Sequence, residues 1–299
     1  MYLAELERRN MLKSRISLLC VLLIAIMMHG LSDRIWAQEN CTEIYGSTGA
    51  RFSLATGSPG ELGLVKALAA AFNQEKNASL CWVKAGSGDS LKMLKEKQVD
   101  MIMVHAPAAE KKAIEDGWAI KRALIGSNEF YIVGPPEDPA GIAKAKTAAE
   151  AYRKIAESAS PFLTRADNSG THKKELDIWK ASGIEPSGNW YVVSKGFMLD
   201  TLKKADELGG YFMTDSSTWT EANRSLKRLK ILFRGDPVMI NTYHTLCQPA
   251  GATAGQAVAS EFIDFVASNK GQQVIRDFGK DRFGEGLYND AEYAKQYDH

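Results

Sequence analysis

The sequence lacks an excess of charge of either sign. Its 299 residues include 37 lysines and arginines against 36 aspartates and glutamates, a formal net charge of +1. Proteins that bind nucleic acid or another acidic polymer need a summed positive field, so this balance argues against such a partner. Hydrophobic residues make up 45% and charged residues 24% of the chain, the composition of an ordinary folded protein with one large or two medium-sized domains.

Cysteine is scarce, with four residues in the chain. Neither CxxC nor HExxH occurs, and the spacing of Cys41, Cys81 and Cys247 matches no zinc motif. We therefore expect no metal cation and no cofactor. The fourth cysteine, Cys20, lies in an N-terminal segment that we expect to be removed. The three that remain are an odd number, so at least one stays unpaired, and the sequence leaves the pairing open. Cys81 stands in an apolar run, where a thiol behaves as a small hydrophobe.

The apolar run near the N terminus is too short to span a membrane. It covers residues 16–28, whereas a spanning helix needs about 20 apolar residues, and it follows the basic residues Arg8, Arg9, Lys13 and Arg15. This pattern predicts a secretory signal peptide over residues 1–37, with an uncleaved anchor as the alternative. Removal of that segment leaves a formal charge of −1. We expect an exported protein without membrane insertion.

Strand-like and helix-like segments alternate along the rest of the chain, which predicts an α/β fold. Three strand and helix pairs come first, at 51–56 and 62–75, 80–84 and 90–97, and 100–105 and 108–117. A second series has helices at 148–158, 171–182 and 198–208 and strands at 162–165, 190–193 and 211–214. Helices at 255–267 and 271–278 complete the pattern.

A cluster of prolines separates the two series. Residues 130–133 are expected to form a crossing strand. It is ended by Pro135, Pro136 and Pro139, which forbid a helix and make this the best candidate for a hinge. We therefore predict two lobes around a ligand cleft, with lobe I formed by residues 48–133 and 246–299 and lobe II by residues 134–245.

Four turns place small or hydroxyl-bearing residues between the end of a strand and the start of a helix. Free backbone N–H groups and the positive end of the helix dipole make such turns suitable for anions. A single turn is explained equally well as a helix cap, but turns of this kind in both lobes favour a shared cleft. The predicted contacts from these turns are Thr56, Gly57, Ser58, Ser87, Ser169, Gly170 and Thr171.

Arg165 is the candidate for the charged contact. It ends an apolar strand directly before one of these turns, where its guanidinium could bind an oxyanion bidentately. The alternative is a structural salt bridge to Asp167 or Glu175. His105 follows an apolar strand and is interpreted as a hydrogen-bonded core histidine rather than a ligand contact.

An enzymatic function is not expected. Ser169 and His172 are close in sequence, but no GxSxG elbow is present, and an isolated Ser/His pair is a weak signal for a hydrolase. His172 stands beside two lysines and is interpreted as part of a solvated helix face.

Several stretches resemble the periplasmic tungstate-binding proteins of ABC importers, within the type II periplasmic solute-binding superfamily. They are LATGS (54–58), VHAPAAEKK (104–112), FYIVGPPEDPAGI (130–142) and TRADNSGTHKKELDIWKASGIEP (164–186). The resemblance, which runs from about residue 50 to about residue 280, implies that tungstate or molybdate is held in the cleft by neutral donors and one arginine. In the family that this chain resembles, an arginine and the threonine six residues after it contact the anion, and these positions correspond to Arg165 and Thr171. It also implies a monomeric periplasmic receptor whose partners are a small anion and ABC permease and ATPase subunits.

Two positions depart from the family pattern. The family's first binding turn resembles three threonines and a serine, whereas this chain has Thr56, Gly57 and Ser58 in a turn one residue shorter. Unpaired oxyanion oxygens cost about 1–3 kcal/mol each, enough to alter selectivity. The second departure is at 215–218, where two serines replace an arginine and a glycine. The alternatives are therefore a small organic anion, such as a carboxylate, sulfonate or phosphate ester, or an exported adhesin or sensor.

Overall fold

The computed structural model describes residues 41–47 and 49–298. The fold described below belongs to one compact unit of the chain and is formed by residues 43–47 and 49–298. The predicted signal peptide lies outside the described residues. Within the described ranges, no helix is long and apolar enough to cross a membrane.

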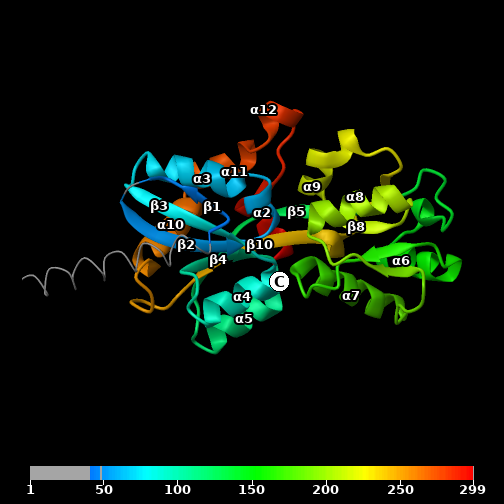
Figure 1. Cartoon of the computed structure of the whole chain (residues 1–299), viewed down its shortest axis with the longest axis horizontal. Coiled ribbons are helices and arrows are strands. Elements are labelled where there is room, and N and C mark those ends of the chain that lie inside the picture. The colour runs from blue at the N-terminus through cyan, green and yellow to red at the C-terminus, as the bar shows by residue number, and fades with distance from the viewer. Residues whose placement is uncertain (1–40, 48, 299) are drawn as a thin grey trace, which may run out of the picture. The chain divides into compact units, whose positions relative to one another are not determined.

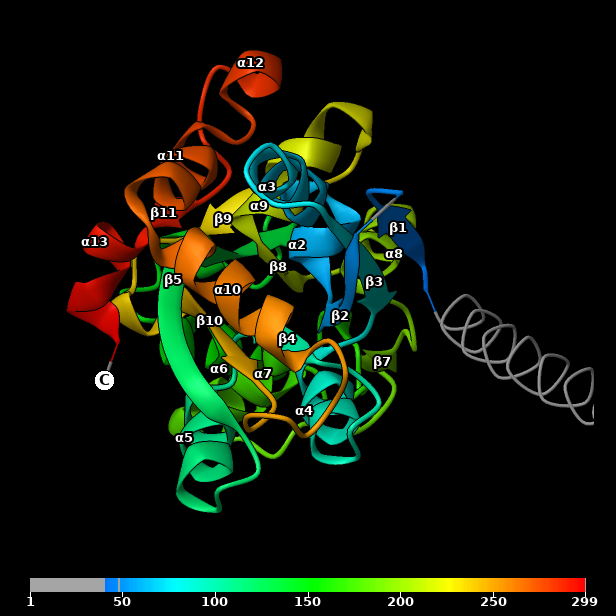
Figure 2. The same cartoon turned by 90° about the vertical axis from the view of Figure 1, so that its left-hand side faces the viewer.

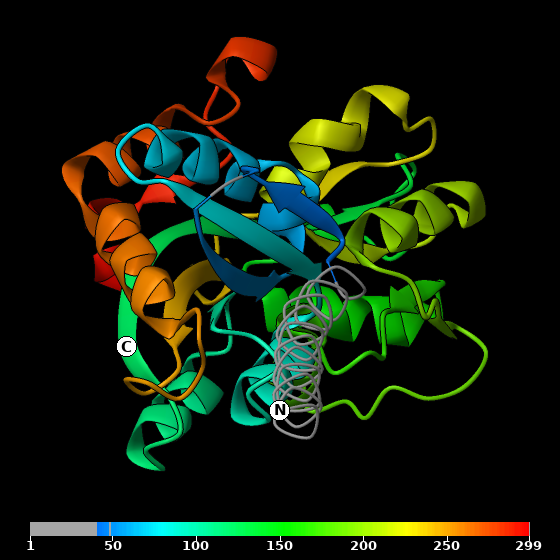
Figure 3. The same cartoon turned by 60° about the vertical axis from the view of Figure 1, so that its left-hand side comes forward.

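Lobe I is built on a mixed sheet with the strand order β1-β3-β2-β4-β10-β5-β11. Its strands are β1 (Glu43–Tyr45), β2 (Ala50–Thr56), β3 (Ala78–Lys84), β4 (Met101–Val104), β5 (Ile120–Gly134), β10 (Ile240–Cys247) and β11 (Asn289–Asp290). β2 pairs in parallel with β3 and β4, whereas β10 runs antiparallel to β4 and β5. Figure 3 shows the short β1, in dark blue, at the edge of the sheet beside β3.

Helices cover both faces of this sheet (Figure 2). Consecutive residues of β2 show the reason, because Leu54 and Ala55 are both fully buried but belong to different hydrophobic clusters. Strands buried on both faces are apolar throughout rather than alternating. One face carries α3 (Leu64–Asn73), α10 (Gln256–Ala267) and α11 (Asn269–Asp277), and the other carries α4 (Ser87–Lys95) and α5 (Pro107–Glu115). The short helices are α2 (Ser58–Glu61), α12 (Lys280–Phe283) and α13 (Ala291–Ala294).

Lobe II, drawn mainly in green and yellow in Figure 1, has a separate core, which is rich in aromatic side chains. Trp179 packs against Tyr152 and Phe162, with ring centroids 4.4 and 5.2 Å away. The strands of this lobe are β6 (Phe162–Thr164), β7 (Tyr191–Val193), β8 (Phe212–Asp215) and β9 (Lys230–Phe233). Its helices are α6 (Ala148–Ser158), α7 (Gly170–Ser182), α8 (Met198–Leu208) and α9 (Ser216–Ala222).

The strand β5 passes from one lobe into the other. It pairs with β10 up to Glu129, and from Phe130 to Val133 it pairs with β8. The chain therefore crosses between the lobes within β5, at the change of partner between Glu129 and Phe130. The hinge predicted at the prolines is wrong in position, because Pro135 comes after this crossing, at the end of β5 in lobe II. Residues 120–129 escaped the sequence prediction because they include Gly126 and several polar residues and form a strand by pairing with β10, more than 100 residues away. The residue bounds predicted for the lobes stay a prediction.

The cysteines correct one expectation. Cys81 is disulfide-bonded, as is Cys41, so Cys81 is not the buried free thiol that its apolar surroundings indicated. It lies in β3, opposite Ile44 of the edge strand β1, and is only partly buried. Among the described residues, Cys247 is the free thiol, and it is fully buried.

Candidate functional site

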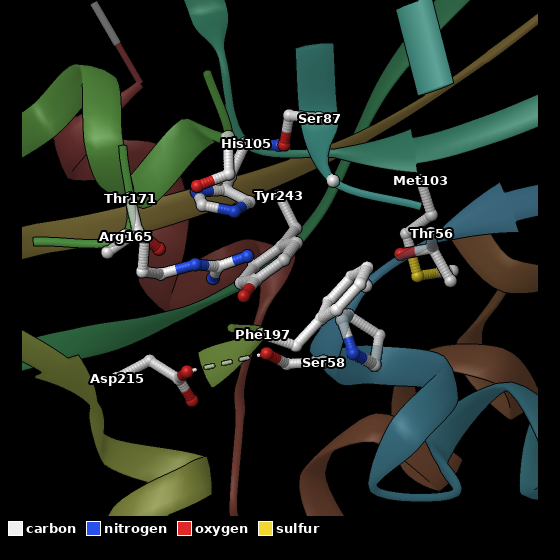
Figure 4. Close-up of a pocket in the computed structure, with 14 residues that line it drawn as sticks. Thr56, Ser58, Ser87, Met103, His105, Arg165, Thr171, Phe197, Asp215 and Tyr243 are labelled. Carbon is white, nitrogen blue, oxygen red and sulfur yellow. Dashed lines mark hydrogen bonds between the residues drawn. The ribbon is translucent and has the colours of Figure 1, made fainter. Parts of the chain in front are cut away.

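A cavity between the two lobes gathers the ends of several strands and the starts of several helices (Figure 4). It encloses about 380 Å³, including its opening to solvent. Lobe I supplies Thr56, Gly57, Ser58, Pro59, Gly86, Ser87, Met103, His105 and Tyr243, and lobe II supplies Arg165, Ser169, Thr171, Phe197 and Asp215. In the described part of the chain, no group of three or more His, Cys, Asp or Glu residues is placed to hold a metal ion.

Arg165 places its guanidinium group on the lobe II wall of the cavity. It follows β6 and is 5% exposed. Its Nε and Nη2 atoms donate to Oδ2 of Asp167 at 2.9 and 2.5 Å, so the salt bridge considered from the sequence exists. Arginine carries five N–H donors, and these bonds use two of them, which leaves three for a ligand. Burial is the largest single influence on Asp167 and opposes its ionisation, but the Arg165 charge together with hydrogen bonds from Ser169 and Arg165 outweighs it, so the pKa of Asp167 lies below its usual value.

Two threonine hydroxyls, one from each lobe, have no hydrogen-bond partner in the cavity. Oγ1 of Thr56 and Oγ1 of Thr171 are buried without one, and each residue is 1% exposed. Thr56 ends β2 in lobe I, whereas Thr171 lies in the first turn of α7 in lobe II. Because an unpaired buried hydroxyl costs about 1–3 kcal/mol, two of them on opposite walls of one cavity indicate a polar ligand between them.

The N-termini of α4 and α7 lie against each other across the cleft. No side chain caps α4, which begins at Ser87, while Ser169 caps α7 by accepting from the backbone N–H of His172 at 3.2 Å. The contact is so close that a Cβ on Gly88 would lie 2.6 Å from the carbonyl oxygen of Asn168. Both helix dipoles therefore present their positive ends at the cleft, where they favour an anion.

His105 lies on the cavity wall, and the prediction of a core histidine is only partly right. The Asn241 side chain is hydrogen-bonded to it, and its ring centroid is 5.0 Å from that of Tyr243. Burial, aided by the charge of Arg165, lowers the pKa of His105 to about 3. The imidazole is therefore neutral near pH 7 and adds no positive charge to the cavity.

Asp215 places a carboxyl group on the lobe II wall of the cavity. Oδ1 accepts from the backbone N–H of Thr218 at 2.9 Å, from Nδ2 of Asn128 at 3.2 Å and from the Ser217 hydroxyl. Oδ2 accepts from the Thr218 hydroxyl at 2.8 Å and, across the cleft, from the Ser58 hydroxyl at 3.5 Å. The hydroxyl of Ser58 thus points to Asp215 and must turn away from it to donate to a ligand.

Comparison with known proteins identifies the family. The PBP superfamily domain matches residues 43–270. A putative ABC transporter anion-binding protein of Haloferax volcanii is 35% identical over 240 residues, which cover 78% of this chain and 70% of that protein. The tungstate-binding protein TupA of Peptoclostridium acidaminophilum is 30% identical over 274 residues, which cover 90% of this chain and 94% of that protein. This chain belongs to the tungstate-binding protein family.

Solved structures of this tungstate-binding protein family share the fold. The crystal structure of the tungstate ABC transporter from Geobacter sulfurreducens is 36% identical with a TM-score of 0.69, covering 76% of this chain and 98% of the other. The two-lobed type II periplasmic binding protein fold predicted from the sequence is therefore confirmed, and these relatives are binding proteins of transporters.

Seven of the eight residues predicted as contacts in this tungstate-binding family member line one cavity. They are Thr56, Gly57, Ser58, Ser87, Arg165, Ser169 and Thr171. The eighth, Gly170, is not on the wall, because its Cα packs against His105 and a Cβ there would lie 2.5 Å from the ring atom Cε1.

Seven further residues line the cavity but were not predicted as contacts: Pro59, Gly86, Met103, His105, Phe197, Asp215 and Tyr243. Asp215 ends β8 and caps α9, the same position between strand and helix that pointed to the other turns, so this signal could have found it. Phe197 and Tyr243 carry no local signal, because only the packing of the two lobes brings them to the cavity.

Proposed function

We propose that this chain is the periplasmic receptor of an ABC importer and that it captures tungstate or molybdate in the cleft between its lobes. Arg165 supplies the charge, and the hydroxyls of Thr56, Ser87, Ser169 and Thr171 donate hydrogen bonds. Gly57 contributes backbone, and Ser58 turns from Asp215 toward the ligand. The bound metal is part of an oxyanion, so the site needs no cation and no cofactor.

The observation that carries this proposal is the pair of buried, unpartnered hydroxyls, Thr56 Oγ1 and Thr171 Oγ1, on opposite walls of a cavity that also holds Arg165. A tetrahedral oxyanion presents acceptors in four directions and accepts from both walls at once. The tungstate-binding names of relatives at 30% and 36% identity support the choice of ligand.

The selectivity proposed here is geometric. The Arg165 charge is already paired with Asp167, Asp215 adds a carboxyl group to the wall, and the neutral His105 adds no positive charge. A dianion is therefore stabilised by aimed N–H and O–H donors and by two helix N-termini rather than by a surplus of cations. Closure of the lobes around the cavity dehydrates the anion and completes its set of donors.

The remaining features of the proposal follow from this role. Residues 1–37 direct export and are removed, and the mature protein acts as a monomer. It presents the loaded anion to permease and ATPase subunits. We assign the chain no catalytic residue.

Calorimetric titration of ligand-stripped, folded protein tests this function. Tungstate, molybdate, sulfate and phosphate are compared with a panel of small carboxylates, sulfonates and phosphate esters. We expect tungstate and molybdate to bind most tightly and to displace every other anion. Failure of all four inorganic oxyanions to bind would overturn the proposal, and an organic anion that tungstate cannot displace would replace it.

A further inference from the structure

One aromatic ring at the cavity contacts cations of both lobes. Phe197 of lobe II lines the cavity directly before α8. Its ring centroid lies 4.4 Å from Nζ of Lys84, which ends β3 in lobe I, and 5.6 Å from Cζ of Arg165. Of the five contacts between a cation and a ring in the described residues, these two share the same ring. Figure 4 shows Phe197 between Arg165 and the side of the cavity formed by lobe I.

The lysine in this contact is held in place by its own lobe. Nζ of Lys84 lies 2.7 Å from Oε1 of Glu61, and the two side chains are 27% and 17% exposed. Glu61 belongs to α2, the helix that begins at Ser58 on the cavity wall. The ammonium is therefore partly desolvated and fixed at the mouth of the cleft, conditions under which a cation and an aromatic face attract more strongly than at an open surface.

The loop that carries Phe197 is equally fixed. The backbone N–H of Ser194 donates to the carbonyl of Thr164 at 2.9 Å, directly before Arg165. The hydroxyl oxygens of Ser194 and Thr201 lie 2.6 Å apart, and the backbone N–H of Gly196 donates to that of Ser194 at 3.0 Å. These bonds join the loop to β6 and α8, so the ring and the guanidinium of Arg165 move together as parts of lobe II.

Lys84 and Phe197 belong to different lobes, so their contact exists only while the cleft is closed. We propose that Phe197 is a positioning residue of the anion site: it binds the Lys84 ammonium on closure and keeps water from the Arg165 guanidinium. This inference rests on the proposed capture of an oxyanion in the cavity. Since the contact is broken on opening, it slows the release of the anion more than it speeds its capture.

Stopped-flow fluorescence with tungstate tests the inference in Phe197→Leu, Lys84→Met and the double variant. Phe197→Leu keeps an apolar side chain but removes the aromatic face. We expect each single variant to release tungstate about 3- to 30-fold faster than the wild type, with a nearly unchanged association rate. The double variant should be little worse than either single variant, because both changes remove one contact. Phe197→Tyr should restore slow release.

The matched control is Tyr131→Leu, which removes the ring under Arg234 at 5.0 Å, a contact within lobe II. We expect it to release tungstate at the wild-type rate. If the wild type binds tungstate and Phe197→Leu releases it as slowly as the wild type does, the proposed positioning role of Phe197 is overturned while the proposed function stands. If the effects of Phe197→Leu and Lys84→Met add independently, the contact between them is also refuted. A wild type that does not bind tungstate overturns both proposals.

Discussion

Replacing Gly88 by alanine tests whether the lobes close as tightly as the structure shows. Gly88 lies in the first turn of α4, and an added Cβ would be 2.6 Å from the carbonyl oxygen of Asn168 in the opposite lobe. Ordinary contacts begin at 3.4 Å, so the lobes would have to separate by about 0.8 Å. The strain falls on closure and not on the fold of lobe I, because the clashing atom belongs to lobe II.

The separation of the lobes in Gly88→Ala sets the expected loss of affinity for tungstate. Hydrogen bonds that are 2.8 to 2.9 Å long on closure would lengthen beyond about 3.5 Å, where they no longer count as bonds. Loss of one hydrogen bond to a charged ligand costs about 1.5–3 kcal/mol, which corresponds to roughly 10- to 150-fold weaker binding of tungstate. The ligand-free protein should be as stable as the wild type or up to about 1 kcal/mol more stable, since alanine favours the helix.

Calorimetric titration and thermal unfolding measure the two effects separately. The matched control is Lys92→Ala, which adds alanine to an exposed position of the same helix and should leave the affinity unchanged. Binding by Gly88→Ala within about threefold of the wild type would refute the reasoning, because such a difference is below the contribution of one charged hydrogen bond.

Three other changes have defined outcomes. Thr171→Val should weaken tungstate binding by about 10-fold or more without lowering the melting temperature of the ligand-free protein, because the hydroxyl it removes is unpaired; a stability loss with full affinity would contradict this. Asp167→Asn should tighten binding by roughly 10-fold in the same titration, since the variant no longer neutralises Arg165, and weaker binding would argue against it. Glu175→Gln should flatten the pH dependence of stability measured by urea unfolding between about pH 5 and about pH 8. Burial raises the pKa of Glu175 to about 7, so the wild type loses stability as pH rises through that value. If the stability of Glu175→Gln fell as steeply with pH as that of the wild type, Glu175 would not be the group responsible.

Much of the local structure could be predicted from periodicity and turn chemistry. The helix expected at 148–158 forms there, with Thr147 accepting from the backbone N–H of Glu150 as its cap. The helix expected at 90–97 begins earlier, at Ser87, because the glycine-bearing turn is itself the first turn of α4. Apolar periodicity does not mark a first turn that faces a cleft, so that boundary could not be read from the pattern.

The residues of the candidate site also fall into those that local sequence could predict and those that it could not. Arg165 and Thr171 could be predicted because each follows from local order, the end of an apolar strand and the start of a helix. The partner of Arg165 was among the alternatives considered, since Asp167 is two residues away. The cation and ring contact at Phe197 could not be predicted, because Lys84 and Phe197 are more than 100 residues apart and meet only across the closed cleft.

The sequence by itself determined the α/β fold, the helix starts that point at the cleft, and the absence of any surplus of positive charge. Only the tertiary structure decided that the crossing strand β5 extends back to Ile120 and pairs with strands of both lobes, and that Asp215 joins the cavity wall. It also decided that the hydroxyls of Thr56 and Thr171 face each other without partners. The physical reason is distance along the chain: Ser58 and Asp215 are 157 residues apart, and such groups meet only after each lobe has folded and the cleft has closed.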